Sequence, residues 1–347
     1  MSQVSKCKGI NKDGSYCKRN ADFGSDFCWQ HKNKENKLNY NLDKETELLM
    51  YSYLPLEEVL TIFRDDIKTR DEIIKKYFKN LPNINKASKN GELETVRYLV
   101  SLGEDPDEYT LNNASGSGNL KLVEYLINLG IKSNKNTLKF ASGSGNLKLV
   151  KYLISLGIKP EGDIIDYASR SGNLKLVEYL VSLGIKPDKI SLNEAIGKGN
   201  LELVEYLVNL GVKPDKTSLD KASEGGNLEL VMYLISLGIV PDIDTLNLGS
   251  ESGNLELVMY LIGLGILPNQ RTLNVGSEYG SPKLIKYLIS LGLKPDKETL
   301  DYASFGGNLE LVKYLISLGI NPDKDTLVYA QGGYSTELAD YLKNIMK

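Results

Sequence analysis

The stretch Pro106–Ile131 reads PDEYTLNNASGSGNLKLVEYLINLGI, and related stretches follow it every 27 residues along the chain. A tyrosine in the same register, Tyr125, has nine counterparts between Tyr98 and Tyr341. Self-similarity sustained over this length is the signature of a repeat architecture. The central Gly-Asn-Leu motif at Gly118 returns at Gly145, Gly172, Gly199, Gly226, Gly253 and Gly307.

Each repeat carries the signals that begin and end two short helices. Pro106 and the side-chain acceptor of Asp107 predict a helix start, and Gly118 predicts its end. Asn119 is expected to cap a second helix, which a left-handed Gly130 would end. Since no room is left for a pair of strands, the sequence predicts an all-α solenoid of about ten antiparallel helix pairs over residues 81–347. The predicted caps of the first helices are Asp107, Asn134, Glu161, Asp188, Asp215, Asp242, Asn269, Asp296 and Asp323.

The second helix of the repeat, residues 120–129, is apolar at all but three positions. Lys121, Glu124 and Asn128 fall on one side of a helix, which predicts a narrow exposed stripe on an otherwise buried helix. Tyr125 lies off that stripe. We therefore expect the tyrosines to pack between helices rather than to form a recognition ladder.

The bulk properties restrict the class of protein. A formal net charge of −3 argues against a surface built throughout for nucleic acid. The first residues lack the apolar stretch of a signal peptide, and no run of about 18 apolar residues could span a membrane. We therefore expect an intracellular protein of the cytoplasm or nucleus, without membrane insertion.

The stretch 299–315, TLDYASFGGNLELVKYL, resembles the ankyrin pattern TPLHxAAxxGHLEVVKLL. Ankyrin repeats are 33 residues long, so each 27-residue copy lacks the six residues that correspond to the β-hairpin finger. The resemblance implies a helical-repeat fold and a protein-binding scaffold. It does not identify the partner, because a repeat fold can present many different surfaces.

Residues 1–38 precede the repeats and contain every cysteine and histidine of the chain. Cys7, Cys17, Cys28 and His31 offer three thiolates and one imidazole, a complete tetrahedral shell for structural zinc. A disulfide with a spare thiol and three free cysteines are the alternatives, and the odd cysteine count in a reducing compartment favours zinc.

This spacing is similar to that of the plant WRC domain, and short Cys₃His elements of this kind resemble ones in large DNA viruses. The WRC resemblance implies nucleic-acid binding. The viral resemblance implies a protein that acts inside a host cell. A staple that only stabilises the small head is the alternative, because so short a segment has little other core.

Residues 39–80 contain a second resemblance. The positions of Leu42, Glu45, Tyr53, Leu54, Pro55 and Val59 resemble an F-box, although Asp43 stands where that pattern has its first proline. The resemblance implies that these six residues dock onto a Skp-type adaptor of a cullin ubiquitin ligase. The alternative is a helical cap that covers the open end of the solenoid.

Departures from the average repeat are where partner choice can be encoded. Ile243 replaces a recurrent lysine, while Leu248 and Val275 are expected on the outward side of the first helices. Clustered exposed apolar residues tend to mark contacts. We therefore predict that Ile243, Leu248 and Val275 bind the target protein, with packing between neighbouring repeats as the alternative.

These features favour a non-catalytic adaptor, in which the repeats bind a target and the head docks elsewhere. A zinc-dependent nucleic-acid or chromatin-associated protein is the alternative function. An enzyme is disfavoured, because a closed zinc site would use every histidine and cysteine and leave neither a His base nor a Cys nucleophile.

Overall fold

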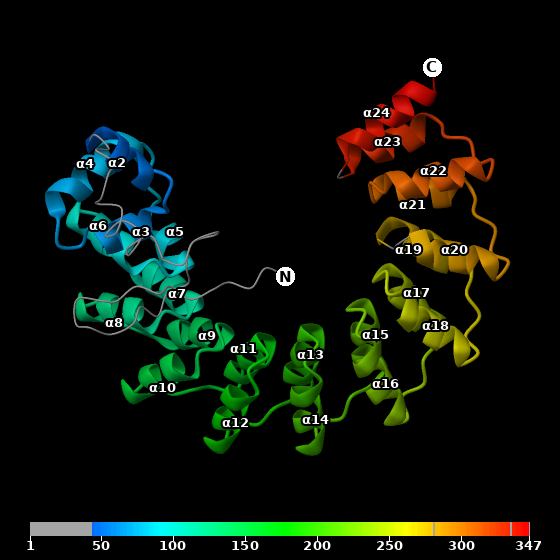
Figure 1. The fold of residues 1–347 in the computed structure, drawn as a ribbon. Helices are drawn as coiled ribbons and strands as arrows, with labels where there is room; N and C mark the ends of the chain where they lie inside the picture. Colours follow the sequence, from blue (N-terminus) through cyan, green and yellow to red (C-terminus); the bar gives the residue numbers. More distant parts are fainter. Residues whose placement is uncertain (1–43, 280–281, 334, 347) are drawn as a thin grey trace, which may run out of the picture. The chain divides into compact units, whose positions relative to one another are not determined.

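The computed structural model describes residues 44–279, 282–333 and 335–346, and these form 23 α-helices and no strand (Figure 1). The predicted all-α repeat fold is therefore confirmed. Contacts divide the chain into two compact units. The first runs to Asn83 and includes Arg97–Ser101, and the second comprises Ile84–Val96 and the chain from Leu102 onward. No helix of the described part is long and apolar enough to cross a membrane.

The first unit contains three short helices, α2 (Lys44–Tyr51), α3 (Leu56–Ile62) and α4 (Ile67–Tyr77). Asp66 caps α4, since its Oδ1 accepts from the backbone amide of Thr69 at 3.1 Å. The apolar faces of the helices meet in two small clusters. The first cluster contains Leu48, Val59 and Ile73, and the second contains Leu56, Leu60 and Ile74.

The second unit is a stack of helices in which each first helix packs against the first helices of its neighbours, and those from α7 to α23 also pack against their own second helices (Figure 1). The first helices are α5 (Ile84–Asn90), α7 (Glu108–Ser117), α9 (Lys135–Gly143), α11 (Ile164–Ser171), α13 (Lys189–Lys198), α15 (Lys216–Glu224), α17 (Ile243–Glu251), α19 (Gln270–Tyr279), α21 (Lys297–Phe305) and α23 (Lys324–Gly332). The second helices are α8 (Leu120–Asn128), α10 (Leu147–Ser155), α12 (Leu174–Ser182), α14 (Leu201–Asn209), α16 (Leu228–Ser236), α18 (Leu255–Gly263), α20 (Pro282–Ser290), α22 (Leu309–Ser317) and α24 (Thr336–Ile345). The helix that follows α5, α6 (Leu93–Ser101), is divided between the two units at Arg97.

The repeated motif acts at both ends of the helices. Asp107 and Thr110 form a reciprocal capping box, in which each side chain accepts a hydrogen bond from the backbone amide of the other residue. Gly118 is left-handed at φ 75°, a conformation that costs other residues strain. Asn119 caps α8 through Oδ1, and its Nδ2 donates to the carbonyl of Gly91 in the preceding repeat at 2.7 Å. The Gly-Asn pair thus ends one helix, starts the next and joins two repeats.

The core is narrower than the sequence predicted. In α8 only Leu122, Val123 and Leu126 are buried, while Tyr125 is half-buried and the following Leu129 is 46% exposed. Lys121 and Asn128 of the expected stripe are exposed, but the exposed side of the helix is wider than predicted, because the residues beside the buried ones are covered only in part.

One predicted cap also differs from the structure. Helix α11 begins at Ile164 after Asp163, whose side chain makes no capping hydrogen bond, so Glu161 does not cap it. Lys135 pairs with Glu161 instead. Pro160 keeps the 27-residue register of the other prolines, so the difference lies after it, where residues 162–163 form a turn before α11 begins.

Candidate interaction surface

The predicted adaptor-binding residues surround the turn between α2 and α3. Tyr53 is 81% exposed and Pro55 is exposed, whereas Leu54 is half-buried against the cluster of Leu48 and Ile73. Val59, predicted as a contact, is completely buried in that cluster, so it supports the turn from inside.

The remaining predictions for the head fall largely outside the described residues. These are the adaptor contact Leu42 and the zinc ligands Cys7, Cys17, Cys28 and His31. Glu45 lies within α2. In the described part of the chain, no group of three or more His, Cys, Asp and Glu side chains is placed to hold a metal ion.

The first helices of the second unit are joined by a ladder of side-chain hydrogen bonds. In each rung, the hydroxyl of a capping-box residue donates to an Asn or Asp of the preceding first helix. The rung from Thr272 Oγ1 to Asn247 Oδ1 is 2.6 Å long and is buried. Further rungs run from Thr110 to Asn85, Thr137 to Asn112, Ser218 to Asn193, Thr245 to Asp220, Thr299 to Asn274 and Thr326 to Asp301.

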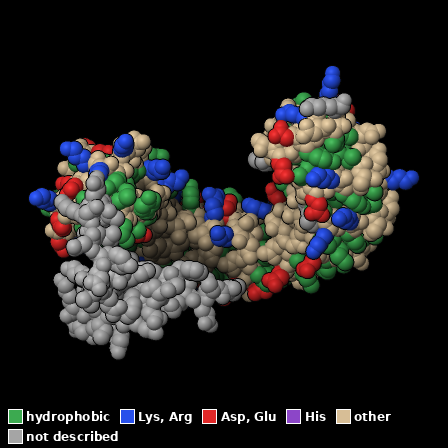
Figure 2. All heavy atoms as spheres, turned by 45° about the horizontal axis from the view of Figure 1, so that its top comes forward, with side chains coloured by type: hydrophobic (Ala, Val, Ile, Leu, Met, Phe, Trp, Pro, Cys, Tyr) green, Lys and Arg blue, Asp and Glu red, His purple; other side chains and the backbone are tan. Residues whose placement is uncertain are grey.

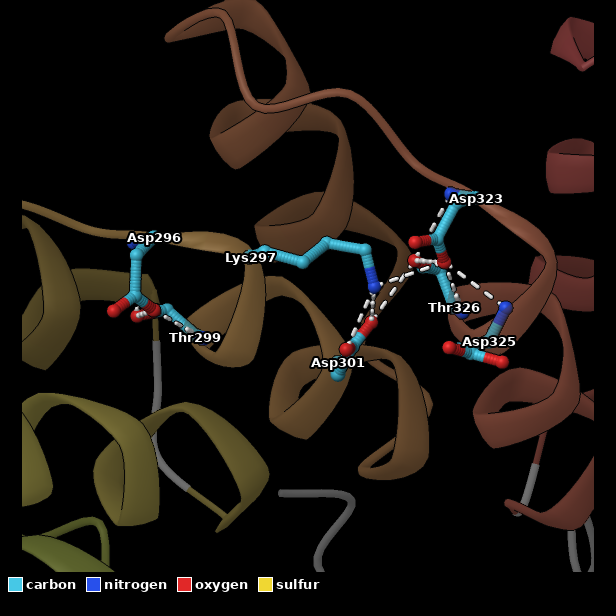
Figure 3. A network of polar contacts seen from close by, with 7 residues as sticks. All are labelled: Asp296, Lys297, Thr299, Asp301, Asp323, Asp325 and Thr326. Carbon is cyan, nitrogen blue, oxygen red and sulfur yellow. Dashed lines mark hydrogen bonds and ion pairs between the residues drawn. The ribbon is translucent and has the colours of Figure 1, made fainter.

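Ion pairs run beside this ladder. Lys297 Nζ lies 2.6 Å from Asp301 Oδ1 in its own helix and 2.9 Å from Asp323 Oδ1, the cap of the next first helix (Figure 3). The Lys297 ammonium, together with the backbone amide of Thr326, lowers the pKa of Asp323 to about 2. Lys216 makes the equivalent pairs with Asp220 and Asp242 at 2.5 and 2.8 Å.

Ile243 interrupts this row of ion pairs. It occupies the position of Lys216 and Lys297, at the first residue of α17, and is half-buried. The cap of the next first helix is Asn269, which carries no charge, and its Oδ1 accepts from the backbone amide of Thr272 at 3.0 Å. The surface at α17 and α19 is therefore less charged than at α15 or α21.

The structure brings the other two predicted target contacts together. Leu248 and Val275 are half-buried and line one hollow between α17 and α19, with a volume of about 230 Å³. The remaining lining residues are polar: Asp244, Asn247, Glu251 and Arg271. Ile243 does not line this hollow.

A second hollow, which the sequence interpretation missed, lies farther along the same row. It has a volume of about 320 Å³ and is lined by three aromatic residues, Tyr302, Phe305 and Tyr329, and by Glu278, Glu298 and Asp301. Tyr302 and Tyr329 follow Leu248 and Val275 at the 27-residue interval. We call this position of the repeat the outward column. Comparing it through all repeats would have found the second hollow.

Glycines set the distance between the helices at the second hollow. A Cβ added to Gly306 would lie 1.9 Å from the carbonyl oxygen of Glu278, and one added to Gly333 would lie 2.2 Å from that of Phe305. Both glycines have negative φ, −64° and −85°, so close approach rather than backbone conformation requires them. The backbone at Glu278 and Phe305, which line the hollow, can therefore approach the next repeat this closely only because Gly306 and Gly333 have no side chain.

Earlier in the chain, aromatic residues of the outward column occupy the corresponding space. Phe140 lies against Gly116, where an added Cβ would be 3.6 Å from its ring atom Cδ1. Tyr167 lies against Gly143 in the same way, at 3.9 Å. The guanidinium of Arg170 also lies 5.6 Å from the centre of the Tyr167 ring.

Met232 and Met259 belong to a different surface, on the second helices α16 and α18, where they are 45% and 47% exposed. In other repeats a lysine at this position lies over the tyrosine of the next repeat. Lys151 Nζ, for example, is 4.8 Å from the Tyr179 ring centre. The half-buried tyrosines thus help to pack one repeat on the next, as predicted.

Comparison with known proteins identifies the repeats. The family model for ankyrin repeats, which describes three copies, matches residues 84–164, 111–191 and 165–272, together more than half of the 347 residues. The solved human ASB11 ankyrin repeat domain is 19% identical, with a TM-score of 0.36, and the match covers 62% of this chain and 99% of that domain. No curated protein sequence matches the chain.

Proposed function

This chain belongs to the ankyrin-repeat family, and we propose that it is a non-catalytic scaffold that holds a protein partner against its first helices. The observation that carries the proposal is the pair of hollows between α17 and α23. Both open on one row of helices, and both are lined by residues of the outward column. Apolar residues grouped with polar ones in this way are typical of protein-binding surfaces.

Within that surface, we propose Leu248 and Val275 as target contacts, with Ile243 at its edge. Ile243 interrupts the ion pairs next to the first hollow, which lowers the cost of removing water from this part of the row. A partner that covers the hollow would replace water around two aliphatic side chains without breaking an ion pair between described residues.

A non-catalytic role agrees with the family and with the inventory of reactive groups. Ankyrin repeats are typically binding modules. Residues 44–347 contain neither His nor Cys, so the repeats lack the commonest general base and the most reactive nucleophile.

For the first unit we propose docking onto a Skp-type adaptor, so that the scaffold recruits its target to a cullin ubiquitin ligase. The turn with exposed Tyr53 and Pro55 and half-buried Leu54 supports this role. Glu45 and Leu42 are the other proposed contacts, and Val59 supports the turn from inside. We also propose one structural zinc held by Cys7, Cys17, Cys28 and His31, on the strength of their donor set.

Affinity capture with the tagged full-length chain tests these roles. We expect a protein target to be lost from a Leu248→Lys, Val275→Lys double variant and retained by a Leu54→Ala, Pro55→Ala double variant. An adaptor and cullin should show the opposite pattern. Capture of nucleic acid without a protein target would contradict the scaffold and favour the alternative function. Where Figure 2 colours the described residues, acidic and basic side chains are interspersed rather than gathered into a continuous basic field, the kind of surface that favours nucleic acid.

Elemental analysis tests the zinc site separately. The purified full-length chain should contain about one equivalent of zinc, and a Cys17→Ser variant should lose it. Full zinc content in that variant would contradict the assignment. Because the repeats have their own core, most helicity should remain when the metal is lost.

A further inference from the structure

We propose, building on the scaffold function, that the outward column from Leu248 to Tyr329 binds a cationic segment of the partner that also carries apolar side chains. Four consecutive repeats place Leu248, Val275, Tyr302 and Tyr329 at one position of neighbouring first helices. Tyr329 is 47% exposed, and the other three are half-buried. Such a series of partly covered apolar groups can receive alternate side chains of one bound segment.

The charge around the column selects the sign of the partner. Carboxylates of Asp244, Glu251, Glu278 and Glu298 line the two hollows, and none of them forms an ion pair with another described residue. The first hollow has one cation, Arg271, and the second has none among its lining residues. Unpaired carboxylates around a partly dehydrated hollow favour lysine and arginine in the partner.

The same carboxylates disfavour other occupants. A nucleic acid or an anionic lipid surface would bring phosphates against unpaired negative charge. A second copy of the chain would bring a further net charge of −3. A purely basic segment would leave the rings of Tyr302, Phe305 and Tyr329 uncovered, whereas apolar side chains between the cations would cover them.

A random peptide display library, panned on the immobilised full-length chain, tests the proposal. We expect selected peptides to be enriched in Lys and Arg next to Leu, Phe or Trp. Their affinity, measured by fluorescence polarisation with the free protein, should weaken with rising salt, because the rim carboxylates are exposed to ions. A failure to select any peptide, or selection of acidic or uncharged ones, would overturn the proposal.

Matched variants locate the binding site. Glu278→Lys and Tyr329→Ser should each weaken the selected peptides at least ten-fold. Glu256→Lys, which makes the same charge change on the second helix α18, and Phe140→Ser, at the same column position with the same 47% exposure, should change the affinity less than two-fold. Thermal melting of each variant shows that it is folded. Equal effects in the test and control variants would contradict binding at this column.

The proposal can fail while the scaffold function stands. If affinity capture recovers a protein target and Glu278→Lys leaves that target bound, the partner contacts another surface. If no target is captured but basic apolar peptides bind at the column, the docking chemistry is supported and the scaffold role is not.

Discussion

The repeats from α9 to α13 and those from α17 to α23 are built on the same motif, yet their first helices present different surfaces. In the earlier stretch the rings of Phe140 and Tyr167 lie against Gly116 and Gly143 of the preceding first helices. In the later stretch Glu278 and Phe305 stand where those glycines were, and hollows lie beside the outward column. The residue at this glycine position therefore distinguishes the earlier, closed stretch from the later, open one.

The two stretches also differ in their polar ladder. Every rung from Asn193 to Thr326 is made, whereas two rungs are missing earlier in the described repeats. One is lost because Ile164 has no hydroxyl. The other is lost because the hydroxyl of Ser191 donates to the carbonyl of Asp188 rather than to Asp166. The open surface therefore rests on the more completely bonded helices.

The largest expected effect concerns the close approach that shapes the second hollow. Gly306→Ala should lower the free energy of unfolding by about 3 kcal/mol, since the new methyl group collides with the Glu278 carbonyl and forces α21 away from α19. Gly225→Ala is the matched control, because Gly225 occupies the same position as Gly306 three repeats earlier. Its Cβ would meet only its own helix, at 3.5 Å or more, so a change of less than about 1 kcal/mol is expected. Similar losses in denaturant unfolding of both variants would refute the steric explanation.

Next in size is the effect on binding. The double change Leu248→Lys and Val275→Lys should weaken the captured target or a selected peptide by at least about ten-fold, or about 1.4 kcal/mol, with Tm nearly unchanged. Phe140→Lys with Tyr167→Lys, the matched pair in the closed stretch, should lower Tm and leave binding intact. A large loss of Tm from the first pair would instead make Leu248 and Val275 part of the core.

The next effect is on stability rather than on binding, and it concerns a single rung. Thr272→Val removes the hydroxyl that donates a hydrogen bond to Asn247 Oδ1. It should lower the free energy of unfolding by about 1–3 kcal/mol, because a buried acceptor loses its donor. Thr272→Ser keeps the hydroxyl and should recover most of this loss. Ser191→Ala, which breaks a capping bond but no rung, should cost less than Thr272→Val in chemical unfolding. The reverse order would mean that the rungs contribute little.

The smallest expected effect depends on pH. Burial, and then the negative charges of Asp188, Asp163 and Glu194, raise the pKa of Asp166 to about 6, against the opposing charge of Arg170. A carboxyl whose pKa rises on folding stabilises the fold at low pH, and this contribution is lost as pH rises through about 6. Asp166→Asn should therefore add about 1 kcal/mol of stability at pH 7, after allowance for solvent screening, and almost none at pH 4. Measuring Tm at both pH values checks the sign, and a stabilisation confined to low pH would contradict it.

The sequence alone determined the repeat and its local chemistry. The period of 27 residues, the Gly-Asn-Leu turn and the caps specify helix pairs, because capping and left-handed glycines act within a few residues of each other. The same periodicity pointed to Leu248 and Val275 as unusual, and the structure places both in one hollow.

Only the tertiary structure decided which surfaces are open. Val59 was predicted as a contact but is buried in the core, and Tyr302 and Tyr329 line a second hollow that the sequence did not predict. Their roles depend on how closely neighbouring helices approach. That distance is set across repeats, at contacts such as Gly306 with the Glu278 carbonyl, between residues 28 positions apart. A pattern of residue types along the chain specifies each helix and its caps, whereas the space left between two helices follows from the side chains of both once they are packed.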